Sequence, residues 1–164
     1  MAVLFLIALF IVGFFVFKKS FPASQMPATS SSNTVYTNTI YGFNFNLPEN
    51  WKGYTVTVDK WIGYAIDAES GNVPFANGPI ILIHNPKWIG ANTYQNIPIM
   101  VFTLDEWDQL QQEKFHIGVA PIGPSALGRN SKYVFALPAR YNFAFPPSYE
   151  EVDKIIQSKP LVAF

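Results

Sequence analysis

The chain has 164 residues, of which eleven are Lys or Arg and eleven are Asp or Glu, so its formal net charge is zero. This balance lacks the basic excess of a nucleic-acid-binding protein, and we expect no nucleic-acid partner. The sequence contains no cysteine, which excludes disulfides, zinc–thiolate sites, iron–sulfur clusters and a cysteine nucleophile.

The first seventeen residues, Met1 to Phe17, carry no charged side chain and are followed by Lys18 and Lys19. As a helix they would span about 25 Å, slightly less than a hydrocarbon core about 30 Å thick. The two lysines can extend their ammonium groups to the interface and make up the difference. The sequence therefore predicts one N-terminal transmembrane helix, with residues 1–19 as the membrane anchor.

The flanks of this segment favour a retained anchor over a cleaved signal peptide, because no basic residue precedes it and no small-x-small site follows it. The positive-inside rule would place Lys18 and Lys19, and the domain after them, in the cytoplasm. Residues 20–34, rich in Ser, Thr and Pro, are instead typical of an extracytoplasmic stalk. We expect a single-pass protein of a bacterial envelope whose domain lies outside the cytoplasm, with a cytoplasmic domain as the alternative.

Residues 35–164 are long enough for a single domain with its own core. From Tyr41 to Leu47 large apolar and small polar residues alternate, and Pro48 then ends the pattern, which predicts a half-buried strand. Further strands are expected at 54–59, 61–66, 80–84, 97–102, 133–137 and 141–145. The first two of these form a predicted hairpin across Asp59 and Lys60, and a loop follows at 69–78.

Two capping boxes predict helices. Thr103 with Glu106 begins a helix over residues 104–114, and Ser148 with Glu151 begins the last helix of the chain. The predicted fold class is α+β, a mainly antiparallel sheet flanked by two helices.

A family resemblance rests on the two ends of this domain. The segment Tyr41-Gly-Phe-Asn-Phe-Asn-Leu-Pro-Glu-Asn-Trp51 resembles the first strand of PsbP/Mog1-like domains, which often begin with a Tyr-Gly-Phe-Ser-Phe-x-x-Pro-x-x-Trp pattern. Val152-Asp-Lys-Ile-Ile-Gln-Ser158 is similar to the final helix of that family. The resemblance implies an α/β/α sandwich that serves mostly as a binding or assembly module, and it implies no catalytic residue.

Five side chains are candidates for ligand binding: the two histidines, a cation in a predicted long loop, and a guanidinium beside an aromatic ring that could clamp a carboxylate. They are His84, His116, Arg129, Arg140 and Tyr141. Each has a structural alternative, namely a hydrogen-bonded core histidine, a solvated basic loop, or an Arg140 that pairs with a helix carboxylate. The sequence has no metal-ligand spacing and no phosphate-binding glycine loop, so we expect neither a metal nor a cofactor.

The leading functional hypothesis is a membrane-anchored, non-enzymatic binding or assembly module whose partner is another envelope protein or a small ligand. One alternative is a small hydrolase that uses Ser125, His116 and Asp105. Its weakness is that Gly123-Pro-Ser-Ala-Leu-Gly128 departs from the Gly-x-Ser-x-Gly elbow. The other alternative is a substrate-capture module that feeds a transporter.

Overall fold

A computed structural model describes residues 34–66, 73–90, 93–118, 122–139, 141 and 144–164, which belong to one compact unit. The predicted anchor at residues 1–19 lies outside these ranges. Within them, no helix is long and apolar enough to cross a membrane.

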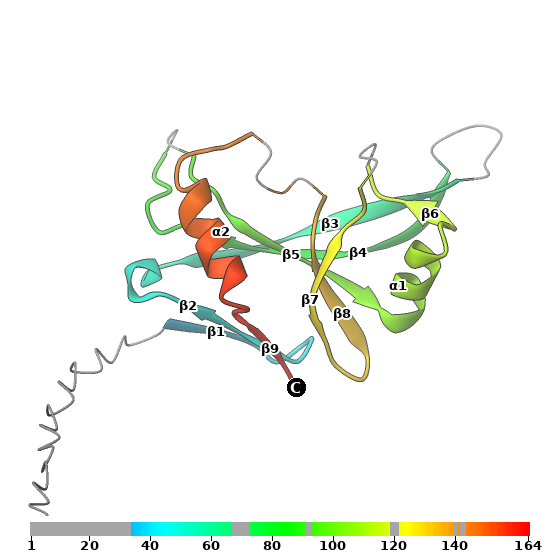
Figure 1. Ribbon diagram of the computed structural model, residues 1–164, viewed down its shortest axis with the longest axis horizontal. Helices are drawn as coiled ribbons and strands as arrows, with labels where there is room; N and C mark the ends of the chain where they lie inside the picture. The colour runs from blue at the N-terminus through cyan, green and yellow to red at the C-terminus, as the bar shows by residue number, and fades with distance from the viewer. Residues whose placement is uncertain (1–33, 67–72, 91–92, 119–121, 140, 142–143) are drawn as a thin grey trace, which may run out of the picture. The chain divides into compact units, whose positions relative to one another are not determined.

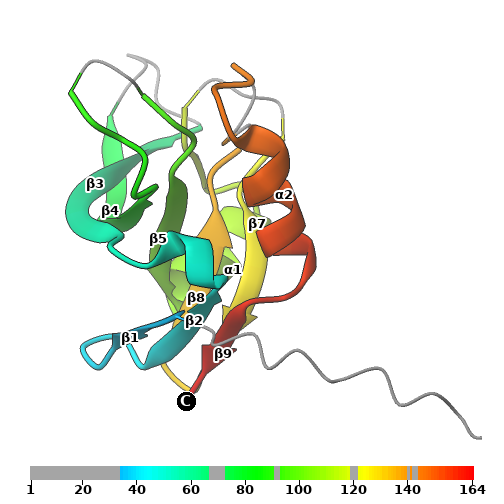
Figure 2. The same cartoon turned by 90° about the vertical axis from the view of Figure 1, so that its left-hand side faces the viewer.

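The larger of two antiparallel sheets has six strands in the order β6-β3-β4-β5-β8-β7 (Figure 1). Its strands are β3 (Thr55–Ala65), β4 (Pro74–His84), β5 (Ile97–Thr103), β6 (Phe115–His116), β7 (Ser125–Arg129) and β8 (Tyr133–Leu137). The sheet is strongly curled, as Figure 2 shows from the side. Every residue of β5 from Ile97 to Phe102 is buried, because the sheet is covered on both faces at this strand.

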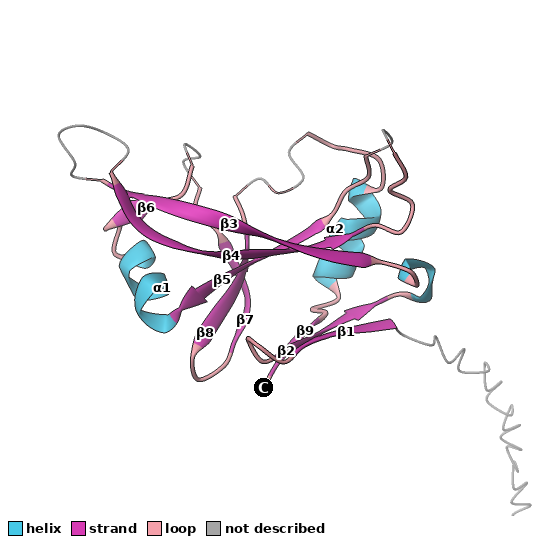
Figure 3. Cartoon of the chain, turned by 180° about the vertical axis from the view of Figure 1, so that it is seen from behind, coloured by secondary structure: helices cyan, strands magenta, loops and turns pink. Residues whose placement is uncertain are grey.

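The smaller sheet has three strands in the order β1-β2-β9. They are β1 (Thr34–Asn38), β2 (Phe43–Leu47) and β9 (Leu161–Ala163). The two α-helices are α1 (Leu104–Gln111) and α2 (Tyr149–Gln157), and a short 3-10 helix, η1, covers Glu49–Trp51. Figure 3 shows α1 and β6 at one end of the large sheet and α2 at the other.

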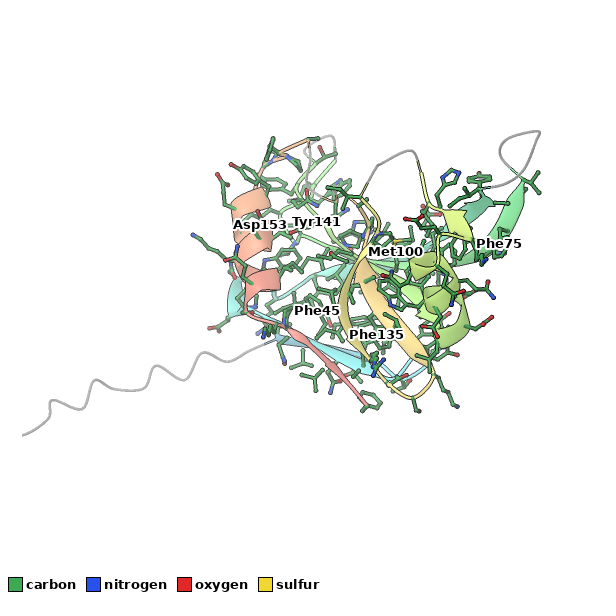
Figure 4. The ribbon with its side chains drawn as sticks, turned by 45° about the vertical axis from the view of Figure 1, so that its right-hand side comes forward. Phe45, Phe75, Met100, Phe135, Tyr141 and Asp153 are labelled. Atoms are coloured by element: carbon green, nitrogen blue, oxygen red, sulfur yellow. The ribbon has the colours of Figure 1, made fainter. Side chains whose placement is uncertain are left out.

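Two hydrophobic clusters lie on opposite faces of the large sheet. Because side chains alternate along a strand, Ile97, Ile99 and Val101 of β5 face one cluster while Met100 and Phe102 face the other. The first lies between the large sheet, the small sheet and α2, and its buried members are Phe43, Phe45, Leu47, Trp51, Ile81, Ile83, Ile97, Ile99, Val101, Phe135, Val152 and Ile155. The second lies on the α1 side and contains Trp61, Met100, Phe102, Phe115, Val134 and Ala136 (Figure 4).

The predicted α/β/α sandwich is wrong. Much of one face of the large sheet is covered by a second β-sheet, with α2 beside it, and the eight-residue α1 lies at one end of the other face. The structure is therefore mostly antiparallel β-sheet with two short helices. Periodicity in the sequence identifies a face that must be buried, but it does not identify whether a helix or a sheet buries it.

Several predicted elements also need correction. The hairpin at Asp59 and Lys60 is wrong, because β3 runs straight through both residues and pairs with β4 along its length. The predicted loop at 69–78 contains the start of β4, and the described residues of 141–145 lie outside any strand. The predicted strands at 80–84, 97–102 and 133–137 are confirmed.

The two capping boxes have different outcomes. At α1 the box is present: Thr103 Oγ1 accepts the Glu106 N–H at 3.2 Å and the Glu106 carboxylate accepts the Thr103 N–H at 2.7 Å. At α2 the box is wrong, because Ser148 is left-handed with φ 71° and its side chain makes no capping bond. The Glu151 carboxylate instead accepts hydrogen bonds from the 3-10 helix.

A glycine on β4 makes room for the central tryptophan of the second cluster. Gly78 lies opposite Trp61 in the register of β3 and β4, and a Cβ on Gly78 would lie 2.6 Å from Trp61 Nε1. The indole therefore lies across β4 and donates from Nε1 to the Val101 carbonyl on β5 at 2.9 Å. This hydrogen bond satisfies the one polar group of a side chain that is 2% exposed.

We expect Gly78→Ala to reduce the free energy of unfolding by about 1–3 kcal/mol, because the new methyl group must displace the indole. Denaturant melts measure this change. Gly123→Ala is the control: a Cβ there meets nothing within 4 Å, so its effect should stay within about 0.5 kcal/mol. Equal effects of the two changes would show that Trp61 moves aside without cost.

Candidate functional site

The two histidines do not share a site. His84 lies opposite Thr55 at the start of β3, whereas His116 lies opposite Tyr64 near its end. Nine residues of strand separate these positions (64 − 55), which is about 30 Å at ~3.3 Å per residue. Any site must therefore be built around one histidine or the other.

The contacts of His84 are those of a side chain that stabilises the fold. Its Nε2 lies 2.7 Å from the Thr57 hydroxyl on the neighbouring strand, and its ring packs edge-on against Trp88 with centroids 5.2 Å apart. The side chain is half-buried, and its Nε2 already has a partner. The alternative of a hydrogen-bonded histidine fits His84 better than a ligand-binding one.

Of the other predicted site residues, the described ones, Arg129 and Tyr141, do not line the pocket around His116. Arg129 is exposed at the end of β7, where it lines a shallow pocket beside Trp107. Arg140 lies outside the described residues. Tyr141 is half-buried against the first hydrophobic cluster, and its hydroxyl donates a short hydrogen bond to Asp153 Oδ1 on α2 (Figure 4). Tyr141 therefore fastens the segment before α2 to that helix.

Burial of the Tyr141 phenol raises its pKa well above the ordinary value of about 10, and the hydrogen bond to Asp153 raises the pKa further. The folded state thus keeps this proton at pH values where the unfolded chain has lost it. The stabilisation is fully present below about pH 10 and is lost as the pH rises further.

We expect thermal melts between about pH 9 and 11.5 to show a steeper loss of stability for the native chain than for Tyr141→Phe. Tyr54 and Tyr149, whose pKa values are also raised, contribute the same background slope to both proteins. Parallel slopes would show that Tyr141 titrates normally in the folded state.

The strongest candidate site is a pocket of about 490 Å³ around His116, which we call the His116 pocket. Its walls come from the end of β3, the end of α1, β6 and the segment that enters β7. The lining residues are Ile66, Leu110, Gln111, Glu113, Phe115, His116, Ile117, Ile122, Gly123, Pro124 and Ser125.

The second hydrophobic cluster positions His116. Its neighbour Phe115 is buried and stacks on Trp61 and Phe75, with ring centroids 6.2 and 5.3 Å away. Because successive residues of a strand point to opposite faces, the His116 side chain is directed away from that cluster. Its Nδ1 lies 2.7 Å from the Gly118 carbonyl oxygen. A carbonyl only accepts, so Nδ1 carries the hydrogen, and in the neutral ring Nε2 keeps its lone pair for a ligand.

The pocket also contains polar side chains that are not used inside the protein. Among the described residues, none hydrogen-bonds to the side chains of Gln111, Glu113 or Ser125. Glu113 was not predicted as a site residue. It follows Gln112, the C-cap of α1, and has φ 56°, a left-handed conformation in which glycine is usual. The sequence does not show that Glu113 has this left-handed conformation; only the backbone of the structure does.

A second pocket, of about 500 Å³ between β2 and α2, is a weaker candidate. Apart from the exposed Lys154, its polar side chains have partners: Asn46 Nδ2 donates to the Pro160 carbonyl at 3.2 Å, and Ser158 Oγ donates to the Ile155 carbonyl at 2.7 Å. Glu151 accepts from Asn50 and Trp51 and pairs with Lys87 at 3.5 Å. Glu151 thus joins α2 to η1, and Asn46 and Ser158 are engaged at the end of α2.

The described lining of the His116 pocket does not include a complete catalytic triad. His116 and Ser125 both line it, but Asp105 does not, and the Asp105 carboxylate accepts a hydrogen bond from Gln109 at 2.8 Å. A backbone carbonyl orients His116 in place of a carboxylate. Within the described ranges, no group of three or more metal-ligating side chains is positioned to hold a metal ion.

Comparisons with known proteins add no assignment. The chain matches no family model, and neither curated proteins nor solved structures gave a match. The resemblance to PsbP/Mog1-like domains remains a prediction from sequence, and the candidate site rests on its own geometry.

Proposed function

We propose that this chain is a membrane-anchored, non-enzymatic binding module that captures a small, partly apolar ligand in the His116 pocket. The observation that carries the proposal is a pocket in which apolar side chains lie beside exposed polar ones that have no partner among the described residues. A volume of about 490 Å³ falls in the range of small-molecule sites, which are mostly apolar with a few convergent polar groups.

The lining suggests how a ligand would be oriented. Leu110, Ile117 and Ile122 offer apolar contact area, and Ile122 is 69% exposed without a ligand. His116 Nε2 can accept a hydrogen bond and the Ser125 hydroxyl can donate or accept one. A ligand that covers the isoleucines and bonds to these two side chains would bury apolar area on both partners.

Sequence alone supports the rest of the proposal. The uncharged run before Lys18 favours an anchor in residues 1–19, and the Ser, Thr and Pro content of residues 20–34 favours a domain outside the cytoplasm. A capture module that hands its ligand to a transporter would use the same pocket and would differ only in its protein partner.

A small hydrolase is the second candidate, because His116 and Ser125 line the same pocket. A serine nucleophile needs a neighbouring base, and that base needs an orienting group and a placed oxyanion site. Ser125 begins a strand instead of a strand-to-helix turn, and no hydrogen bond joins it to His116 in the described part of the chain. These features favour binding over catalysis.

For the anchor, we expect the full-length chain to remain in the membrane pellet after washing with alkaline carbonate. A chain that begins at Val35 should be soluble, since it lacks the uncharged run. Quantitative immunoblotting of the two fractions measures the distribution. Uncut full-length protein in the supernatant would contradict membrane anchoring.

For the pocket, we expect benzyl alcohol at millimolar concentration to shift the methyl resonances of Ile66, Ile117 and Ile122 in isoleucine-labelled protein. Ile155, which lines the other pocket, serves as the internal control and should not shift. Shifts confined to Ile155, or none at all, would remove the basis for ligand binding at His116.

A further inference from the structure

Glu113 gives the His116 pocket a defined charge. It is the only Asp, Glu, Lys or Arg among the described residues that line the pocket, and none of the described residues forms an ion pair with it. Lys114 is adjacent in sequence and exposed, but it does not line the pocket. An anion bound there would meet a carboxylate with no opposing cation, whereas a cation would be attracted.

The backbone supplies a second, independent argument. Glu113 ends α1 in the left-handed region, with its N–H directed to the Leu110 carbonyl at 3.1 Å and the Lys114 N–H bonded to the Gln109 carbonyl at 3.0 Å. This helix ending favours glycine, because a residue with a Cβ is strained there. Lys159 has a similar φ of 53° after α2, but only Glu113 of the two lines a described pocket, and strained residues are common at binding sites.

The remaining polar groups suit a donor-rich ligand. The Glu113 carboxylate and His116 Nε2 are acceptors, and the Ser125 hydroxyl oxygen accepts as well. An ammonium group has three donors and no acceptor, so its chemistry suits a pocket whose charged side chain is an acceptor.

We infer that the His116 pocket selects ligands in which a primary ammonium group is attached to a small apolar group, and that Glu113 binds the ammonium. This inference rests on the proposed function and adds the chemical class of the ligand. The apolar group contacts the isoleucine-lined wall, and the carboxylate distinguishes a cation from a neutral or anionic molecule of the same shape.

The test uses three probes of matched shape and different charge: benzylamine, benzyl alcohol and benzoate. The full-length chain is held in nanodiscs of phosphatidylcholine, which has no net charge, and the isoleucine methyl resonances are followed during titration near pH 7. We expect benzylamine to bind about fivefold more tightly than benzyl alcohol, as for an exposed ion pair worth about 1 kcal/mol. Benzoate should bind most weakly, and the preference for benzylamine should shrink in high salt.

Variants separate the charge of Glu113 from its backbone position. Glu113→Gln should bring benzylamine to the affinity of benzyl alcohol. Glu113→Gly should also remove the preference, and its melting temperature should rise because glycine relieves the left-handed strain. Asp108→Asn, which removes an exposed carboxylate from the same helix, should keep the preference and so controls for the general field of the protein.

The outcomes distinguish failure of the ammonium inference, of the strain argument and of the proposed function. Equal binding of benzylamine and benzyl alcohol, or a preference that survives Glu113→Gln, would overturn the ammonium inference while leaving ligand binding in place. A lower melting temperature for Glu113→Gly would overturn the argument from strain. If none of the three probes shifts the pocket isoleucines, the proposed function itself fails, and the ammonium inference fails with it.

Discussion

The structure depends on burying both faces of one strand, β5. Its six residues from Ile97 to Phe102 are buried, so each face of the large sheet requires a cover. The small sheet with α2 supplies one cover and α1 supplies part of the other. Because α1 follows β5 directly through the Thr103 cap, the end of α1 is carried to the edge of the sheet where β6 pairs with β3. The position of the candidate site is thus a consequence of how β5 is covered.

Packing in the second cluster holds the candidate site in place. Trp61 lies across β4 only because Gly78 has no side chain, and its indole N–H is held by the Val101 carbonyl. Phe115 then stacks on Trp61 and Phe75. Since His116 is the next residue along β6, the stack that fixes Phe115 also fixes the direction of the imidazole. A strand of only two residues would not do this by backbone pairing alone.

Local sequence patterns correctly predicted β5 and β8, whose residues are almost all buried, and the capping box of α1. They failed at Asp59 and Lys60, where polar residues resemble a turn. There β3 has β4 as its only strand partner in the described sheet, and exposed side chains are tolerated along this stretch. The sandwich prediction failed because burial of a face does not identify its cover. His116 was predicted from its residue type, but Glu113 was missed, because its role depends on a backbone angle and on a pairing of β6 with β3 that is distant in sequence.

Several polar side chains join one element to another at the α2 end of the large sheet, whereas those of the His116 pocket at the α1 end are mostly exposed to solvent. At the α2 end, Glu151 accepts hydrogen bonds from Asn50 and Trp51, and Tyr141 donates to Asp153, so polar groups join one element to another. At the α1 end, among the described residues, Glu113 and Ser125 have no such partners, although both line the same pocket. The α1 end combines exposed polar side chains, a glutamate in the left-handed region and exposed isoleucines around one pocket, and it is there that we propose a ligand binds.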